Sequence, residues 1–125
     1  MACGVVIVDD AADLRQLLVF AFARDPRLTV VADVGDGQQA IDAVHEHVPD
    51  IVLMDVAMPV MDGITATRLL KQDFPHLPVV VFTGYGDERV EREARDAGAA
   101  AFLDKTVPLT AVADTLVETA GGSRE

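Results

Sequence analysis

The chain has 125 residues and half of them are apolar, which is enough for one buried core in a single domain. Its net charge of −11 would repel phosphate backbones, so we expect no direct binding of nucleic acid by this chain. No apolar run reaches the roughly 20 residues that span a bilayer, and the N-terminus lacks a signal-peptide pattern, so we expect a cytoplasmic protein without membrane contact. The one cysteine, Cys3, excludes an internal disulfide and is expected to be buried.

The first half of the chain predicts three strands and two helices in alternation. Residues 5–8 are consecutive β-branched residues and predict a buried strand, whereas residues 28–34 alternate more and predict a strand at a sheet edge. An apolar stripe between them predicts the first helix: Leu14, Leu17, Leu18, Ala21 and Phe22. A similar stripe predicts the second helix: Ala40, Ile41, Val44 and Val48. Residues 51–54 then predict a third, fully buried strand.

The second half continues the alternation. Residues 64–73 predict a third helix, and the apolar run at residues 79–82 predicts a fourth strand. A thin stripe predicts the fourth helix: Val90, Ala94 and Ala97. Residues 99–103 are rich in alanine and predict a weak fifth strand. The final helix is predicted by six apolar positions: Leu109, Val112, Ala113, Leu116, Val117 and Ala120.

Strand and helix alternate five times, which is typical of an α/β fold. The strands read as continuous apolar runs, so both faces of the sheet should be buried under helices. The sequence therefore predicts a doubly wound five-stranded parallel sheet. We assign residues 1–120 to this domain and residues 121–125 to a polar tail.

Five polar side chains follow the predicted strands at points that hydrophobic packing does not explain: Asp9, Asp10, Asp55, Thr83 and Lys105. In a parallel sheet these strand ends share one edge, so the side chains should converge. A single acid after a strand is more often a helix N-cap or a solvated charge. Three acids together repel one another unless a cation compensates them, and oxygen ligands favour Mg²⁺. The set fits phosphoryl transfer, with Asp55 as nucleophile and Asp9 and Asp10 as metal ligands.

The sequence around these positions resembles the receiver domain of two-component response regulators over essentially the whole chain. The resemblance rests on residues 5–10, on Asp55 with Met58-Pro59 and Met61-Asp62-Gly63, on Thr83, and on Phe102 with Lys105. It implies a flavodoxin-like fold with strand order 2-1-3-4-5 and phosphorylation by a sensor histidine kinase. Thr106 and Pro108-Leu109 are similar to the branch whose receivers precede helix-turn-helix DNA-binding domains. The chain would then be a stand-alone receiver or the input domain of a transcriptional regulator.

The resemblance also implies a role for each residue of the site. Asp55 would accept the phosphoryl group. Asp10, the Asp55 side chain and the backbone carbonyl of Ala57 would bind Mg²⁺ directly, with Asp9 acting through water. Thr83 and Lys105 would hold the transferred group.

Three further features follow from the resemblance. Phe102 occupies the family's switch position and would turn inward together with Thr83 on phosphorylation, although a core phenylalanine explains it equally well. The fourth helix, fifth strand and fifth helix would form the surface for partners or a homodimer. Ala57 and Tyr85 would flank the phosphoryl pocket, and an alanine that cannot position water beside a bulky tyrosine should slow loss of the phosphoryl group.

Three other functions fit the sequence less well. An aspartyl phosphatase or phosphotransferase usually has a second acid two residues after the nucleophile, where this chain has Ala57. A flavin-binding electron carrier needs a first loop that accepts phosphate, and Asp9 and Asp10 would repel it. A receiver that acts without phosphorylation would not need the complete pocket. We therefore expect a signalling module rather than an enzyme, one that catalyses only its own phosphotransfer and autodephosphorylation.

Overall fold

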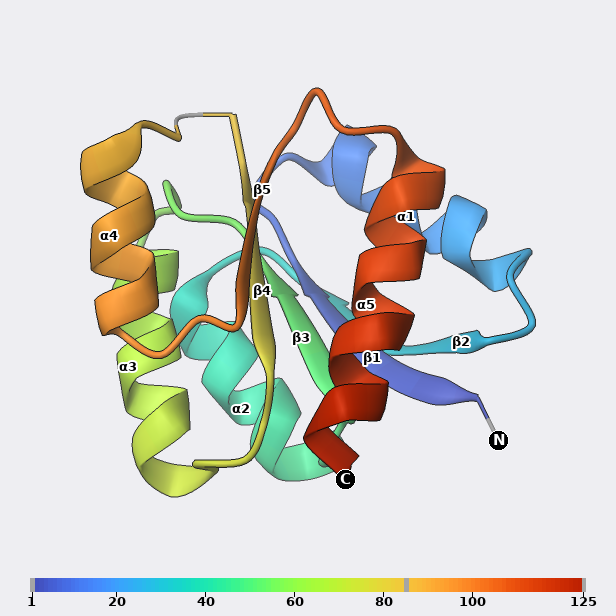
Figure 1. Cartoon of the computed structure of the whole chain (residues 1–125), viewed down its shortest axis with the longest axis horizontal. Coiled ribbons are helices and arrows are strands. Elements are labelled where there is room, and N and C mark those ends of the chain that lie inside the picture. Colours follow the sequence, from blue (N-terminus) through green and yellow to red (C-terminus); the bar gives the residue numbers. More distant parts are fainter. Residues whose placement is uncertain (1, 85, 125) are drawn as a thin grey trace.

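The computed structural model describes residues 2–84 and 86–124, with side chains up to residue 121 (Figure 1). Its strands are β1 (Cys3–Val8), β2 (Leu28–Val34), β3 (Ile51–Met54), β4 (Val79–Thr83) and β5 (Ala101–Asp104). Its helices are α1 (Ala12–Ala23), α2 (Gly37–His47), α3 (Gly63–Asp73), α4 (Glu88–Asp96) and α5 (Leu109–Arg124). All strand pairs are parallel and the order is β2-β1-β3-β4-β5, which confirms the predicted sheet.

Helices cover both faces of the sheet, so its central strands are buried on both faces. Val5 and Ile7 of β1 point toward α1 and α5, whereas Val6 and Val8 point toward α2 and α3. Figure 1 shows α1 and α5 on one side of the sheet and α2, α3 and α4 on the other. Successive strand residues alternate between two apolar layers, and this is why the strands read as unbroken apolar runs.

Three helices begin at an aspartate whose side chain caps the first turn. Asp36 accepts the amide of Gln39 at 2.9 Å. Asp62 and Asp87 accept amides at 2.8 Å in the same way, at the starts of α3 and α4. Such a cap satisfies one of the amides that a helix start leaves without an intrahelical partner. The N-cap of α1 is Ala11, with no side-chain cap bond, so Asp9 and Asp10 are not the caps of that helix.

Among the differences from the sequence-based expectation are the exposure of Leu17 and the end of the final helix. Leu17 belongs to the predicted apolar stripe of α1 but is 52% exposed, whereas Leu18 and Phe22 of the same helix are buried in the core. The final helix continues to Arg124, past the expected start of the polar tail at residue 121. No proline interrupts this segment, and each added helical residue gains a backbone hydrogen bond.

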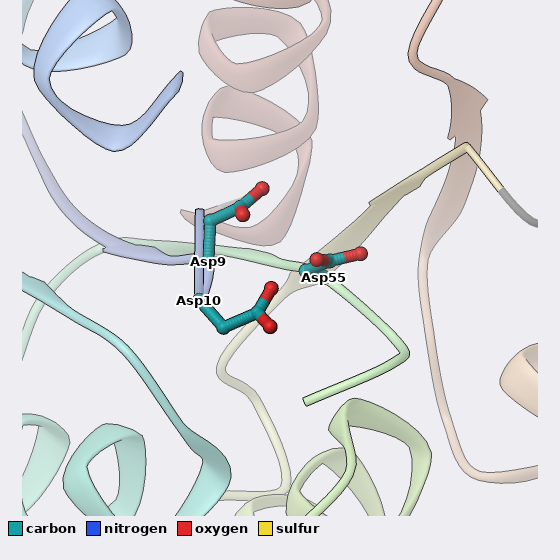
Figure 2. Close-up of side chains that lie close together, drawn as sticks. All are labelled: Asp9, Asp10 and Asp55. Carbon is teal, nitrogen blue, oxygen red and sulfur yellow. The ribbon is translucent and has the colours of Figure 1, made fainter. Parts of the chain in front are cut away.

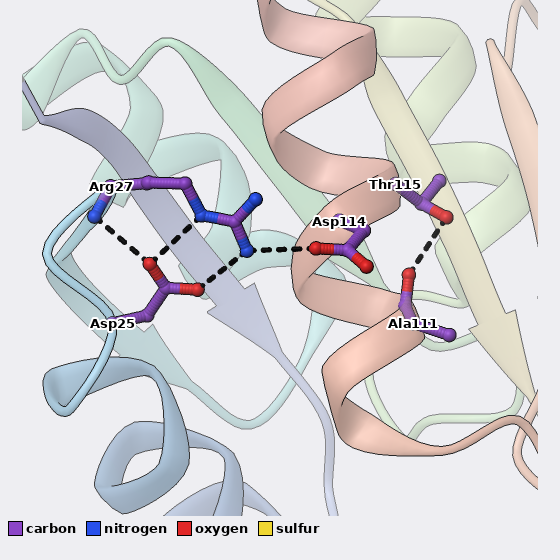
Figure 3. Close-up of polar contacts among 5 residues, drawn as sticks. All are labelled: Asp25, Arg27, Ala111, Asp114 and Thr115. Atoms are coloured by element: carbon purple, nitrogen blue, oxygen red, sulfur yellow. Dashed lines mark hydrogen bonds and ion pairs between the residues drawn. The ribbon is translucent and has the colours of Figure 1, made fainter.

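Arg27 ties the turn after α1 to α5, as Figure 3 shows. Its guanidinium binds Asp25 through two nitrogens at 3.0 and 2.8 Å and Asp114 at 2.8 Å. The hydrogen bond from Arg27 holds the pKa of Asp25 below its ordinary value. Arg27 and Asp114 are exposed and Asp25 is half-buried, so the cluster positions the turn against α5 more than it stabilises the fold.

Candidate functional site

The predicted site residues lie together at the carboxyl edge of the sheet. Asp9 and Asp10 follow β1, Asp55 follows β3, Thr83 ends β4 and Lys105 follows β5. Figure 2 shows the three carboxylates gathered beyond the ends of β1 and β3. One oxygen from each of them lies within 4.8 Å of the others. Parallel pairing alone produces this convergence, because it places every strand end at the same edge.

Lys105 bridges two of the three acids. Its Nζ lies 2.8 Å from Oδ2 of Asp9 and 3.2 Å from Oδ2 of Asp55. Asp9 and Asp55 are almost fully buried, whereas Asp10 is exposed. One cation among three carboxylates leaves an excess of negative charge in a half-buried site. An all-oxygen donor set with that charge fits a hard divalent cation such as Mg²⁺.

Backbone amides fix the two buried carboxylates. The amide of Ala11 donates to Oδ1 of Asp9 at 2.9 Å, and the amide of Val56 donates to Oδ1 of Asp55 at 2.8 Å. Each carboxylate thus has one oxygen engaged by backbone and the other by Lys105. Their positions are set before any ligand arrives, which limits the reorganisation that binding requires.

Burial and charge act on the site in opposite directions. Burial raises the pKa of Asp55, and the neighbouring charge of Asp9 raises it further, against the opposing effect of Lys105. Burial alone would lower the pKa of Lys105, but its hydrogen bonds and charge interactions with Asp9 and Asp55 together raise it. Lys105 therefore remains an ammonium group at neutral pH. The pocket disfavours a third negative charge until more positive charge enters.

The loop after β3 depends on two glycines: Gly63, which belongs to the motif that carries the family resemblance, and Gly37, which nothing in the sequence marks as part of the site. A Cβ at Gly63 would lie 1.7 Å from the carbonyl oxygen of Asp55, so only glycine allows α3 to start this close. A Cβ at Gly37 would lie 2.6 Å from the carbonyl oxygen of Met61, which accepts the Gly37 amide at 3.0 Å. Between these anchors Val60 has a φ of 69° and is 83% exposed.

The structure also describes three of the other predicted residues: Thr83, Ala57 and Phe102. Thr83 is fully buried at the end of β4, and Ala57 is exposed on the loop after β3. Phe102 is half-buried and packs against the cluster between the sheet and α4. A Cβ at Gly86 would lie 2.8 Å from its ring, so the β4–α4 loop lies directly over that ring. Tyr85 lies outside the described residues.

One further residue that the sequence did not single out reaches the site. Nη1 of Arg15 donates to the carbonyl oxygen of Asp9 at 2.6 Å. In the sequence, Arg15 reads as a solvated residue of an amphipathic helix, since nothing local marks its contact across the sheet edge.

Comparison with known proteins agrees with this architecture. Residues 5–117 match the response regulator receiver domain family. The chain is 38% identical over 105 residues to a protein-glutamate methylesterase/protein-glutamine glutaminase of Nitrosospira multiformis, covering 82% of this chain and 29% of that protein. It is 36% identical over 114 residues to the transcriptional regulatory protein DegU of Brevibacillus brevis, covering 91% of this chain and 47% of that protein.

A solved structure is similar over nearly the whole chain. It is a two-component response regulator of the LuxR family from Aurantimonas sp. SI85-9A1, with a TM-score of 0.92, 27% identity, and coverage of 98% of this chain and 87% of that one. The chain spans less than half of the two curated relatives, so their full activities do not transfer to it. None of the described helices is long and apolar enough to cross a membrane. Family match, sequence identity and fold agree, and the chain belongs to the response regulator receiver domain family.

Proposed function

We propose that this receiver domain accepts a phosphoryl group on Asp55 from a sensor histidine kinase, in a reaction that requires Mg²⁺. The observation that carries the proposal is the position of the Asp55 carboxylate, 3.2 Å from Lys105 Nζ and beside two further acids within 4.8 Å. Family membership supports the same chemistry.

The reaction is a transfer between a nitrogen and an oxygen. An Asp55 oxygen attacks phosphorus, the P–N bond of a phosphohistidine breaks, and its electron pair returns to the imidazole nitrogen. The product is an acyl phosphate on Asp55. The phosphoryl oxygens bring negative charge into an already acidic site, and Lys105 Nζ lies where it can pair with one of them. The Thr83 hydroxyl, at the next strand end, is the second candidate donor.

The residues for the metal are those of the acidic cluster. Asp10, the Asp55 carboxylate and the backbone carbonyl of Ala57 would hold Mg²⁺ directly, and Asp9 would act through water. Bound Mg²⁺ would neutralise the excess carboxylate charge and the incoming phosphoryl oxygens. The hydrogen bonds from backbone amides to Asp9 and Asp55 keep both carboxylates in place for this purpose.

Phosphorylation would be read out through Thr83, Phe102 and the surface of α4, β5 and α5. The Phe102 ring lies under the β4–α4 loop, so a movement of Thr83 toward the phosphoryl group would change the space available to the ring. We assign partner or homodimer contacts to this surface, and an input role in a transcriptional regulator or a stand-alone role to the domain. Ala57 and Tyr85 would set how long the phosphoryl group remains.

The proposal is tested by incubating the chain with acetyl phosphate and measuring its intact mass. Wild type should gain one phosphoryl group with Mg²⁺ and none with EDTA. Asp55→Asn should gain none, whereas Asp42→Asn, the same charge change on the exposed face of α2, should behave as wild type. Equal labelling of wild type and Asp55→Asn would refute the assignment. Continuous release of phosphate from a phosphomonoester would instead favour a phosphatase.

A further inference from the structure

Arg15 lies across the ends of β1 and β2, behind the acidic cluster. Its Nη1 donates to the carbonyl oxygen of Asp9 at 2.6 Å, and its Nε donates to Oδ1 of Asp33 at 3.0 Å. The Arg15 side chain is 21% exposed and its bond to the Asp9 carbonyl is partly buried, whereas the Asp33 carboxylate is 42% exposed. A planar guanidinium that makes two directed bonds holds its partners in a fixed relation, which a lysine ammonium does less well.

The carbonyl that Arg15 holds belongs to the peptide joining Asp9 to Asp10. Because a peptide unit is planar, fixing its oxygen fixes the orientation of the next residue's Cα. On the other side of Asp9, its amide donates to the Val34 carbonyl at 3.0 Å. Both peptides that flank Asp9 are thus anchored to β2 or to Arg15. Asp10 is exposed, and this anchored peptide determines the direction in which its side chain leaves the sheet.

The surroundings of Arg15 maintain this contact. Asp33 forms an ion pair with it at 3.0 Å, which offsets its charge near the cluster. A Cβ at Gly35 would lie 3.3 Å from Nη1, tighter than an ordinary contact, so the glycine leaves room for the guanidinium. The Arg15 guanidinium is therefore paired with Asp33 on one side and has room beside Gly35 on the other.

We infer that Arg15 is a positioning residue for the metal site: it orients the Asp9–Asp10 peptide so that Asp10 faces Asp55. This inference rests on the proposed function, because it assigns Arg15 to the same Mg²⁺ site. The direction of the effect separates geometry from charge. A positive group near a cation site weakens cation binding, so loss of its charge alone would make Mg²⁺ bind more tightly. Loss of its geometry would make Mg²⁺ bind more weakly.

The test is a calorimetric Mg²⁺ titration of the full chain at constant ionic strength. Arg15→Gln should raise the Kd for Mg²⁺ about 10-fold, the usual effect of removing a group that orients a ligand. Arg15→Lys keeps the charge but not the geometry, so its log Kd for Mg²⁺ should lie closer to that of Arg15→Gln than to that of wild type. Arg24→Gln removes the same charge from the exposed C-cap of α1 and should leave Kd within about 2-fold of wild type.

A second readout needs no metal. In EDTA, the NMR amide signals of Asp10 and Ala11 should shift or broaden in Arg15→Gln and stay unchanged in Arg24→Gln. If Arg15→Gln does not fold, Gly35→Ala retains the charge while crowding the guanidinium, and should weaken Mg²⁺ binding in the same direction.

The outcomes separate this inference from the proposed function. If wild type binds Mg²⁺ and Arg15→Gln binds it equally or more tightly, the role of Arg15 is overturned and the proposed function stands. The same holds for Gly35→Ala if that variant replaces Arg15→Gln. No Mg²⁺ uptake by wild type would overturn both.

Discussion

Replacing Gly63 by alanine should damage the fold at the point where it supports the site. The added Cβ would lie 1.7 Å from the carbonyl oxygen of Asp55 and 2.8 Å from its carbonyl carbon. Ordinary contact between such atoms is about 3.5 Å, so the methyl group would approach to half that distance. Both clashing atoms are backbone at the end of the buried strand β3, and no side-chain rotation can relieve them. The hydrogen bond from the Gly63 amide to the Val56 carbonyl, 2.8 Å long, would be strained as well.

We expect Gly63→Ala to lower the free energy of unfolding by about 3–5 kcal/mol, above the usual cost of overpacking because the backbone itself must move. Urea denaturation followed by far-UV circular dichroism measures this change. Gly121→Ala is the matched control, since nothing lies within 4 Å of that Cβ and alanine in a helix should stabilise by about 0.5–1 kcal/mol. A Gly63→Ala protein within about 1 kcal/mol of wild type would show that the loop accommodates the methyl group and that this reasoning is wrong.

Two other outcomes follow from the site and its loop. Val60→Gly should stabilise the fold by about 0.5–1 kcal/mol. It removes the positive-φ strain of about 1–2 kcal/mol at an exposed residue, and the greater conformational entropy of glycine in the unfolded chain offsets part of this gain. Val60→Ala retains Cβ and should gain less; a Val60→Gly protein less stable than wild type in thermal unfolding would contradict this. In EDTA at pH 7, Asp55→Asn should be more stable than wild type, since the folded protein raises the pKa of Asp55 and disfavours its ionised form. The difference in stability between Asp55→Asn and wild type should narrow as pH falls through the raised pKa of Asp55, because Asp55 of the folded wild type then takes up a proton. A difference that widens as pH falls would contradict this prediction.

The sheet and the convergence of the site could be predicted because both follow from local patterns and one general rule. Apolar runs such as residues 51–54 mark buried strands, and parallel strands end at a common edge. The sequence therefore predicts that Asp9, Asp55 and Lys105 lie together, and the structure places Lys105 within ion-pair distance of both acids. The strand order came from the family resemblance rather than from the pattern.

The rest depends on contacts between residues that are distant in sequence. Gly37 is needed because Met61 passes over it, and no pattern near Gly37 announces that approach. Arg15 lies on a helix whose sequence shows only an amphipathic stripe, and its partner Asp33 is on another element. Leu17 and Leu18 fit the apolar stripe equally well, and the way α1 packs on the sheet decides that Leu18 is the buried one. Such features come from packing geometry, which a single sequence does not encode residue by residue.

The proposed function requires that Asp55 itself carries the phosphoryl group. Borohydride reduces an acyl phosphate on aspartate to homoserine, so it marks the modified residue permanently. Protein treated with acetyl phosphate and Mg²⁺, reduced and digested, should contain homoserine at position 55 and aspartate at positions 9, 10 and 62. Homoserine at one of those other positions, with Asp55 unmodified, would contradict the assignment of Asp55 as phosphoryl acceptor.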